Sequence, residues 1–258
     1  MKAFLEFAFD ACKQAGKITL EYFQKNPQIE IKPDQSPVTI ADRLSEKRIR
    51  ELIEKYYPDH AIVGEEYGGA KSDKKYCWFI DPIDGTKAFV QGVPIYGVML
   101  GLEISGEFSV GVIHFPVLNE IVGAARGEGC FWNGSPAHVN RDATLKETLF
   151  CHSGREYFEQ QGRLKAYQEL EEATGWQRTW GDCYGHVLVA TGRAGCCIDP
   201  TLNAWDAGAI IPIVEEAGGT FTDWRGKKSA YSREGISTNG ILLQQVLDIT
   251  SKYPPHQL

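Results

Sequence analysis

Two aspartates with a forced turn between them form the first stretch of the chain that could do chemistry. In CWFIDPIDGTK, residues 77–87, an apolar run ends at Asp81, and Asp84 follows three residues later. Pro82 fixes its own φ and Gly85 permits a close backbone approach, so the chain turns sharply and aims both acids at a common point. Asp and Gly are also frequent in ordinary solvated turns, so this stretch alone leaves that alternative open.

Two further acids stand at the ends of predicted elements. Glu65 follows a short apolar strand at 61–63, and Asp206 stands at the start of a helix whose apolar residues repeat at helical spacing. Asp206 has a plain structural explanation, because an acid near a helix N-terminus stabilises the helix dipole, and Glu65 taken alone also favours an ordinary structural role. Together with Asp81 and Asp84, however, they suggest a site with oxygen ligands only, which hard cations such as Mg²⁺ prefer.

The charges of these four acids favour a site that metal and phosphate share. Carboxylates held together without a counter-ion repel one another strongly. Three Mg²⁺ ions would balance the four acids and a phosphate dianion, whereas two would leave a deficit for nearby lysines or helix dipoles. We therefore expect magnesium as the cofactor, with two to three ions per site.

The motifs around these acids resemble one family. GEE at 64–66, DPIDGT at 81–86, WDAGAI at 205–210 and EEAGG at 215–219 occur in the order and spacing of the inositol monophosphatase family. The resemblance covers nearly the whole chain and implies an α/β (α+β) fold, a layered αβαβα sandwich. It also implies Mg²⁺-dependent hydrolysis of a small-molecule phosphate ester by an activated water, lithium sensitivity, and a homodimer.

Site residues follow from the resemblance position by position. The metal ligands it implies are Glu65, Asp81, Asp84, Asp206 and the backbone carbonyl of Ile83. Glu65 and Thr86 would also orient the nucleophilic water, and the backbone N–H groups of Gly85 and Thr86 would hold the phosphate. Asp42 would support a third metal, and Lys32 would lie on the loop beside it.

The segment RTWGDCYGHVLVATGRAGCCIDP, residues 178–200, bears on the substrate. It is similar to the branch of the family that hydrolyses histidinol phosphate in histidine biosynthesis, as is the segment at 85–102. Histidinol phosphate carries an ammonium and an imidazole, so a pocket for it benefits from carboxylates. We expect Asp182, Asp199 and Arg178 to contact the substrate.

Alternatives remain open at this stage. Asp182 could cap a helix, Asp199 could be a turn acid, and Trp180 and Tyr184, which could flank the imidazole, could be core aromatics instead. An inositol-1-monophosphatase or a 3′(2′),5′-bisphosphate nucleotidase would share the same metal site. A catalytically silent regulatory protein would share the fold.

Helices and strands must bring these residues together. Periodicity predicts helices at about 1–25, 41–57, 86–90, 156–173, 183–192, 204–217 and from 240. It predicts strands at 61–63, 77–81, 95–104, 108–115, 120–125, 148–152, 195–199 and 236–238. We expect two α/β halves, about 1–145 and 146–258. Because no Pro/Gly/Ser linker separates the halves, we expect one domain over residues 1–258.

Composition excludes several other classes of protein. A net charge of −7 argues against binding to nucleic acid or a membrane surface, both of which need a basic face. Glu6 and Asp10 interrupt the N-terminal apolar run, which favours a helix over a targeting peptide and hence a cytoplasmic location. The seven cysteines show no C-x-x-C and the histidines no metal-ligand spacing, so we expect reduced, mostly buried thiols.

Overall fold

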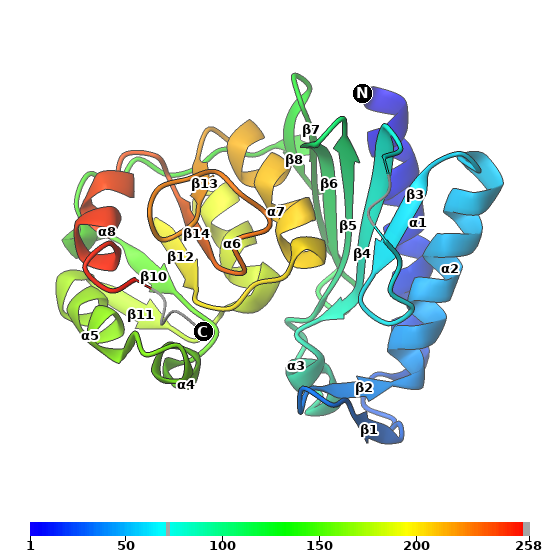
Figure 1. Cartoon of the computed structure of the whole chain (residues 1–258), viewed down its shortest axis with the longest axis horizontal. Coiled ribbons are helices and arrows are strands. Elements are labelled where there is room, and N and C mark those ends of the chain that lie inside the picture. Colours follow the sequence, from blue (N-terminus) through cyan, green and yellow to red (C-terminus); the bar gives the residue numbers. More distant parts are fainter. Residues whose placement is uncertain (71–72, 255–258) are drawn as a thin grey trace.

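A seven-stranded sheet holds the first half of the chain in the computed structural model, which describes residues 1–70 and 73–254 (Figure 1). The strands follow the order β3-β4-β5-β6-β7-β8-β9; β3 and β4 are parallel and the other neighbours antiparallel. Their bounds are β3 Ala61–Gly64, β4 Tyr76–Asp84, β5 Gly97–Ile104, β6 Glu107–Phe115, β7 Glu120–Ala125, β8 Gly129–Trp132 and β9 Ser135–Pro136.

A five-stranded sheet holds the second half, in the order β11-β10-β12-β14-β13. β10 is parallel to β11 and β12, whereas β14 is antiparallel to β12 and β13. The bounds are β10 Leu149–Cys151, β11 Trp176–Arg178, β12 Cys196–Asp199, β13 Thr220–Thr222 and β14 Gly235–Thr238. A separate hairpin pairs β1 Ile29–Ile31 with β2 Pro37–Thr39, and a short 3₁₀ turn covers Leu145–Glu147.

Helices cover both sheets and separate them, which gives the expected αβαβα order (Figure 1). α1 Lys2–Tyr22 and α2 Ile40–Tyr56 lie on the outer face of the seven-stranded sheet. α6 Asp182–Ala190 and α7 Ala204–Glu216 lie between the sheets. α4 Arg155–Gln160, α5 Leu164–Ala173 and α8 Leu243–Thr250 cover the five-stranded sheet, and the short α3 Thr86–Val90 follows β4.

Helix α7 lies unusually close to the seven-stranded sheet because glycines face it. A Cβ built on Gly101 of β5 would lie 2.5 Å from the carbonyl carbon of Gly208, and one on Gly111 of β6 would collide with the carbonyl oxygen of Ala209. Residues 206–214 are all buried, as expected for a helix covered on every side. The lack of a side chain at Gly101 and Gly111 therefore allows α7 to lie where it does, and α7 in turn sets the position of Asp206.

The predicted helix at 156–173 is wrong as a single element. The structure divides it into α4 and α5, and Gly162 between them has φ 68°, a left-handed conformation that interrupts a right-handed helix. The last helix begins at Leu243 rather than at 240, because Gly240 also has a positive φ of 82°. Strands β2, β8, β9, β11 and β13 were not predicted, since they are short and lack a clear alternation.

The remaining predicted elements are confirmed to within a few residues. All seven cysteines are buried and free of disulfides, as expected. Within residues 1–70 and 73–254, no helix combines the length and apolar character needed to cross a bilayer.

Candidate active site

Strand β4 carries Asp81 and Asp84 out of the sheet. Its pairing with β5 becomes irregular between these two residues, where Pro82 cannot donate a ladder hydrogen bond. The backbone N–H of Ile83 donates to Asp81 Oδ1 at 3.0 Å, which holds the carboxylate against the turn. Gly85 then adopts φ 81° and leads into α3. The predicted turn is therefore present, and it leaves both acids at the same end of the strand.

Helix α7 delivers the third acid from the other half of the chain. Asp206 lies in its first turn, where its Oδ2 accepts the backbone N–H of Asn203 at 2.8 Å as part of a capping box. The same carboxylate also lies against that of Asp81 of β4. The helix cap that offered an alternative explanation for Asp206 is real, and it orients the same side chain toward β4.

The carboxylates of Asp81, Asp84 and Asp206 form one cluster, in which ligand oxygens all lie within 4.8 Å of one another. Burial and the neighbouring carboxylates raise the pKa of Asp81 and Asp84 well above the usual range. Burial raises the pKa of Asp206 to about 7. Three buried carboxylates at this distance are costly when ionised, and a hard divalent cation would relieve that cost. The donor set of this cluster therefore fits Mg²⁺.

Glu65 lines the same cavity but stands outside the cluster of three. It follows β3, and its backbone N–H donates to the carbonyl of Ile80 at 3.1 Å. Its carboxylate accepts the ammonium of Lys32 at 2.6 Å, and Lys32 also reaches Glu66 at 2.7 Å. The structure thus brings Lys32 of the β1–β2 hairpin directly against an expected metal ligand.

Thr86 lines the cavity beside these acids, and the buried Asp42 lies next to Thr86. The hydroxyl of Thr86 donates to the carbonyl of Ile83 at 2.9 Å and lies 3.5 Å from Asp42 Oδ1. Asp42 is buried at the start of α2, where its Oδ2 accepts the N–H and hydroxyl of Thr39. Burial raises the pKa of Asp42 to about 6. Thr86 therefore connects Asp42 to the turn that carries Asp84.

A cavity of about 290 Å³ opens over these groups. Its acidic end consists of Glu65, Asp81, Ile83, Asp84, Thr86 and Asp206, and Gly85 lies beside them. The rest of its lining includes Asp182, Ser153, Glu156, Tyr157, Lys87 and Trp205. The metal and phosphate residues expected from the sequence thus share one cavity, apart from Asp42, which acts from behind Thr86.

Asp182 is the expected substrate residue that reaches the cavity. It begins α6 in a left-handed conformation with φ 51°, and its Oδ2 lies 3.3 Å from the position that a Cβ on Gly85 would take. Burial raises the pKa of Asp182 to about 6, and the nearby carboxylate of Asp199 adds to the effect. The N–H of the next residue, Cys183, donates to Asp84 Oδ2 at 2.5 Å.

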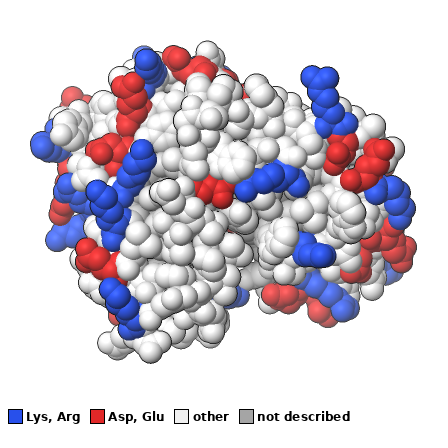
Figure 2. All heavy atoms as spheres, turned by 180° about the vertical axis from the view of Figure 1, so that it is seen from behind, with Lys and Arg blue, Asp and Glu red and all other residues white. Residues whose placement is uncertain are grey.

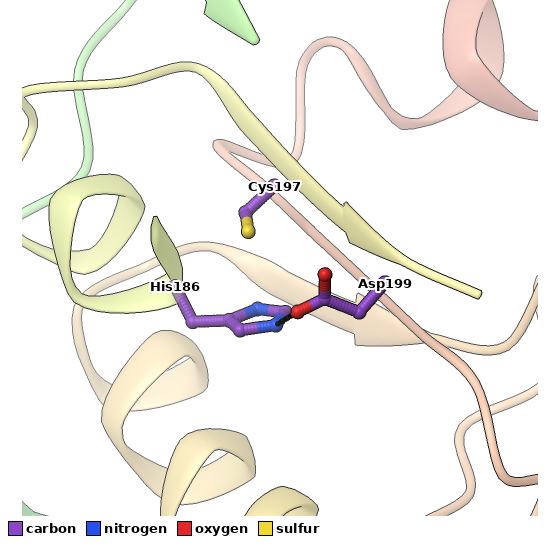
Figure 3. Close-up of side chains that lie close together, drawn as sticks. All are labelled: His186, Cys197 and Asp199. Carbon is purple, nitrogen blue, oxygen red and sulfur yellow. Dashed lines mark hydrogen bonds and ion pairs between the residues drawn. The ribbon is translucent and has the colours of Figure 1, made fainter. Parts of the chain in front are cut away.

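Asp199 and Arg178 lie elsewhere. Asp199 is 1% exposed, and its oxygens are occupied by His186 at 3.0 Å and by Ser153 (Figure 3). The Arg178 guanidinium is exposed and donates to the carbonyl of Gln177 at 2.7 Å. Among the described residues, neither belongs to the cavity lining. Direct contact of either side chain with a substrate stays a prediction that the present geometry does not favour.

The two aromatic candidates are also outside the described lining. Trp180 is 43% exposed and lies 6.0 Å from the guanidinium of Arg178. Tyr184 packs edge-on against Phe115, with ring centroids 5.0 Å apart, so the core alternative describes it.

Sequence reasoning missed several other residues of the cavity lining. Lys87 donates to the hydroxyl of Tyr157 at 2.6 Å, and both line the cavity together with Glu156. Lys87 directly follows the DPIDGT motif, so its position offered a signal. Ser153, Glu156 and Tyr157 carry no motif; the packing of α4 brings Glu156 and Tyr157 to the cavity, and Asp199 holds Ser153 there.

Known proteins are similar to this chain over nearly its whole length. The model of the inositol monophosphatase family matches residues 1–253. A histidinol-phosphatase of Chlorobaculum parvum is 44% identical over 233 residues, 90% of each chain, and one of Streptomyces coelicolor is 33% identical, covering 94% of this chain and 95% of the relative. The solved structure of an IMPase from Thermotoga maritima superposes with a TM-score of 0.89 at 31% identity, covering 97% of each chain.

Proposed function

The chain belongs to the inositol monophosphatase family and is a phosphatase, and from this premise we propose that it hydrolyses L-histidinol phosphate with Mg²⁺. The observation that supports this substrate best is Asp182, a carboxylate that lines the cavity beside Gly85 at the start of α6. A carboxylate there suits a cationic group and disfavours a second anion. Similarity to histidinol-phosphatases over 90% of the chain supports the same substrate.

The expected metal ligands are Glu65, Asp81, Asp84, Asp206 and the carbonyl of Ile83, which would hold two to three Mg²⁺ ions. When bound, the ions would supply charge neutralisation and Lewis-acid activation for an in-line displacement. The chain's own groups do the rest. The backbone N–H groups of Gly85 and Thr86 hold the phosphate, and the carboxylate of Glu65 and the hydroxyl of Thr86 orient the attacking water.

The organic half of the ester lies toward α6 in this proposal. The carboxylate of Asp182 accepts a hydrogen bond from the ammonium or the imidazolium, and the pair is strengthened by the partly dry cavity. The N–H of Cys183 donates to Asp84 of the metal cluster. Asp182, which precedes Cys183 and binds the cation, is therefore held next to that cluster. Phosphate and cation are thereby held at a fixed separation.

Other properties of the proposal follow from membership of the family. We place the enzyme in the cytoplasm as a homodimer that lithium inhibits. Histidine biosynthesis is the pathway that consumes this ester.

The second candidate is an inositol monophosphatase, favoured by the match to the Thermotoga maritima IMPase over 97% of each chain. It would use the same acids, so the organic half of the substrate decides between the two. An inositol ring offers hydroxyl groups and no cation, so Asp182 would accept a hydrogen bond from a neutral hydroxyl and would form no ion pair.

Turnover of three esters separates these functions. L-Histidinol phosphate, myo-inositol 1-phosphate and 3′-phosphoadenosine 5′-phosphate are assayed side by side with Mg²⁺ and with EDTA. We expect kcat/KM for L-histidinol phosphate to exceed the others at least ~10-fold, as about 1.4 kcal/mol of selective binding would give, and EDTA to abolish turnover. A better rate on either other ester rejects the proposed substrate, and EDTA-resistant turnover rejects the metal.

A further inference from the structure

A buried histidine lies beneath the cavity and bonds through both ring nitrogens. His186 of α6 is 1% exposed, its Nδ1 lies 2.7 Å from Ser237 Oγ, and its Nε2 lies 3.0 Å from Asp199 Oδ2 (Figure 3). A carboxylate can only accept here, so Nε2 carries the hydrogen and donates it. The mechanism proposed above gives His186 no task.

Asp199 passes this contact toward the cavity. While Oδ2 faces His186, Oδ1 accepts both the backbone N–H of Ser153 at 3.1 Å and its hydroxyl at 2.5 Å. A buried carboxylate needs such partners, because an unpaired one costs several times a normal hydrogen bond. Asp199 therefore fixes Ser153, and His186 fixes Asp199.

Ser153 in turn holds the residue that we assign to the substrate cation. Its hydroxyl oxygen accepts the backbone N–H of Asp182 at 3.1 Å. Asp182 has φ 51°, a left-handed conformation that is uncommon for non-glycine residues and that Asp adopts more readily than most. A Cβ on the preceding Gly181 would collide with the backbone N of Ser153, so the two segments touch directly. The sequence of contacts runs from His186 through Asp199 and Ser153 to Asp182.

A metal site is the other chemistry that His186 could offer, because Cys197 is close by. Ligand atoms of His186, Cys197 and Asp199 lie within 4.8 Å of one another (Figure 3). Both ring nitrogens and both carboxylate oxygens, however, already bond to protein groups. Burial also raises the pKa of the Cys197 thiol well above its usual range, which disfavours the thiolate that a metal needs. The hydrogen-bonded chain accounts for these groups without a metal.

We infer that His186 and Asp199 are positioning residues for substrate selectivity: through Ser153 they hold Asp182 where it binds the cationic part of the ester. This inference rests on the proposed function. It assigns Asp199 an indirect role in place of the direct substrate contact expected from the sequence. It also predicts that loss of this positioning raises KM for esters with a cationic group and leaves KM for esters without one nearly unchanged.

The test compares His186→Leu with His186→Gln. Leucine removes the donor to Asp199, whereas the glutamine amide can replace the Nε2–H. We expect His186→Leu to raise KM for L-histidinol phosphate about 10-fold, the effect of one lost hydrogen bond to a charged group, with KM for myo-inositol 1-phosphate and both kcat values within about 2-fold. His186→Gln should recover most of the wild-type KM.

A double-mutant cycle with Asp182→Asn tests the route. If His186 acts through Asp182, His186→Leu adds little to the KM of Asp182→Asn. If the KM increases of the two single variants instead multiply in the double variant, the inference is overturned. An equal rise of KM for both esters in His186→Leu overturns it as well. Ser153→Ala, at a half-buried position, should give the same selective loss and serves if His186→Leu does not fold; an unchanged KM ratio in Ser153→Ala likewise overturns the inference.

Amide hydrogen exchange separates this inference from the proposed function. His186→Leu should speed exchange of the Asp182 N–H, which bonds to Ser153, while the amides of α1 keep their wild-type rates. This readout needs no substrate. Unchanged exchange at Asp182 refutes the positioning chain even if L-histidinol phosphate is the substrate. Faster exchange with poor wild-type turnover of that ester keeps the chain of contacts and rejects the substrate.

Discussion

Single residues decide what this cavity can bind, and the acid cluster is the clearest case. Burial and neighbouring carboxylates raise the pKa of Asp81, Asp84 and Asp206, whose ligand oxygens lie within 4.8 Å of one another. Such a cluster lowers the stability of the metal-free protein and is relieved when a cation binds. Function and stability therefore pull in opposite directions at the same side chains.

Asp84→Asn should reveal this opposition. The amide oxygen can still accept the N–H of Cys183, but one buried charge disappears. We expect Mg²⁺-dependent activity to be lost. We also expect the Tm of the metal-free protein to rise by a few degrees, because each kcal/mol gained in the free energy of unfolding raises Tm by ~2–4 °C in a chain of this size. Calorimetry with and without Mg²⁺ checks both. Asp10→Asn, at an exposed position of α1, is the control for the loss of one negative charge. Unchanged Mg²⁺-dependent activity in Asp84→Asn would remove Asp84 from the metal site.

Asp182→Asn tests recognition of the cation. Loss of a charged hydrogen bond costs ~1.5–3 kcal/mol, so KM for L-histidinol phosphate should rise about 10-fold or more. KM for myo-inositol 1-phosphate should change less. Glu156→Gln removes a charge from the exposed side of the same cavity and serves as the matched control. Steady-state kinetics that show equal changes on both esters would exclude Asp182 from cation recognition.

Local sequence explains why some of these residues could be predicted and others could not. Asp81, Asp84, Gly85 and Thr86 are contiguous, and their turn follows from proline and glycine chemistry alone. Asp199 offered no such signal. Its burial depends on His186, thirteen positions away, and on the packing of α6 against β12 and β14, which one sequence without its fold does not reveal.

At the scale of elements, glycines set the distances between layers. Gly101 and Gly111 allow the backbone of α7 to approach β5 and β6, and α7 carries Asp206 to the end of β4. The two halves of the active site are thus joined where the backbone of α7 approaches the sheet, amid apolar side chains from both. The stability of this contact depends on close packing rather than on a specific bond.

Gly111→Ala should therefore damage both stability and the site. The added methyl meets the backbone of Ala209, which cannot rotate away. We expect a loss of ~1–3 kcal/mol in the free energy of unfolding, as for other overpacked cores, and weaker Mg²⁺ binding because Asp206 shifts. Denaturant unfolding and calorimetric Mg²⁺ titration measure the two effects. Glu107→Ala, exposed on the same strand, should change stability by less than ~0.5 kcal/mol. Wild-type stability in Gly111→Ala would show that α7 adjusts without cost.

Long, strongly periodic elements were predictable, and short ones were not. α1, α2, β6 and α7 match their expected ranges closely because each buries a regular stripe or face. The helix expected at 156–173 failed at Gly162, where the left-handed conformation depends on how α4 and α5 pack. β11 and β13 contain three residues each, too few for a period to show.

At the scale of the whole molecule, the five layers place the cavity where elements from both halves meet. β3, β4 and α3 contribute from the first half, and α4, α6 and α7 from the second. Charged side chains of both signs gather toward the two ends of the face in Figure 2, and its middle is mostly uncharged. With a net charge of −7, the molecule attracts Mg²⁺ and cationic groups at long range but does not attract anions. The anionic phosphate must therefore be attracted locally.

The most direct test of this account is a crystal structure with Ca²⁺ replacing Mg²⁺ and L-histidinol phosphate bound. We expect Ca²⁺ among Asp81, Asp84 and Asp206, phosphate at the N–H groups of Gly85 and Thr86, and a substrate nitrogen ~3 Å from the Asp182 carboxylate, a normal hydrogen-bond distance. An ion bound elsewhere would contradict the assignment of the acid cluster. A substrate whose cationic half points away from Asp182 would contradict the basis proposed for selectivity.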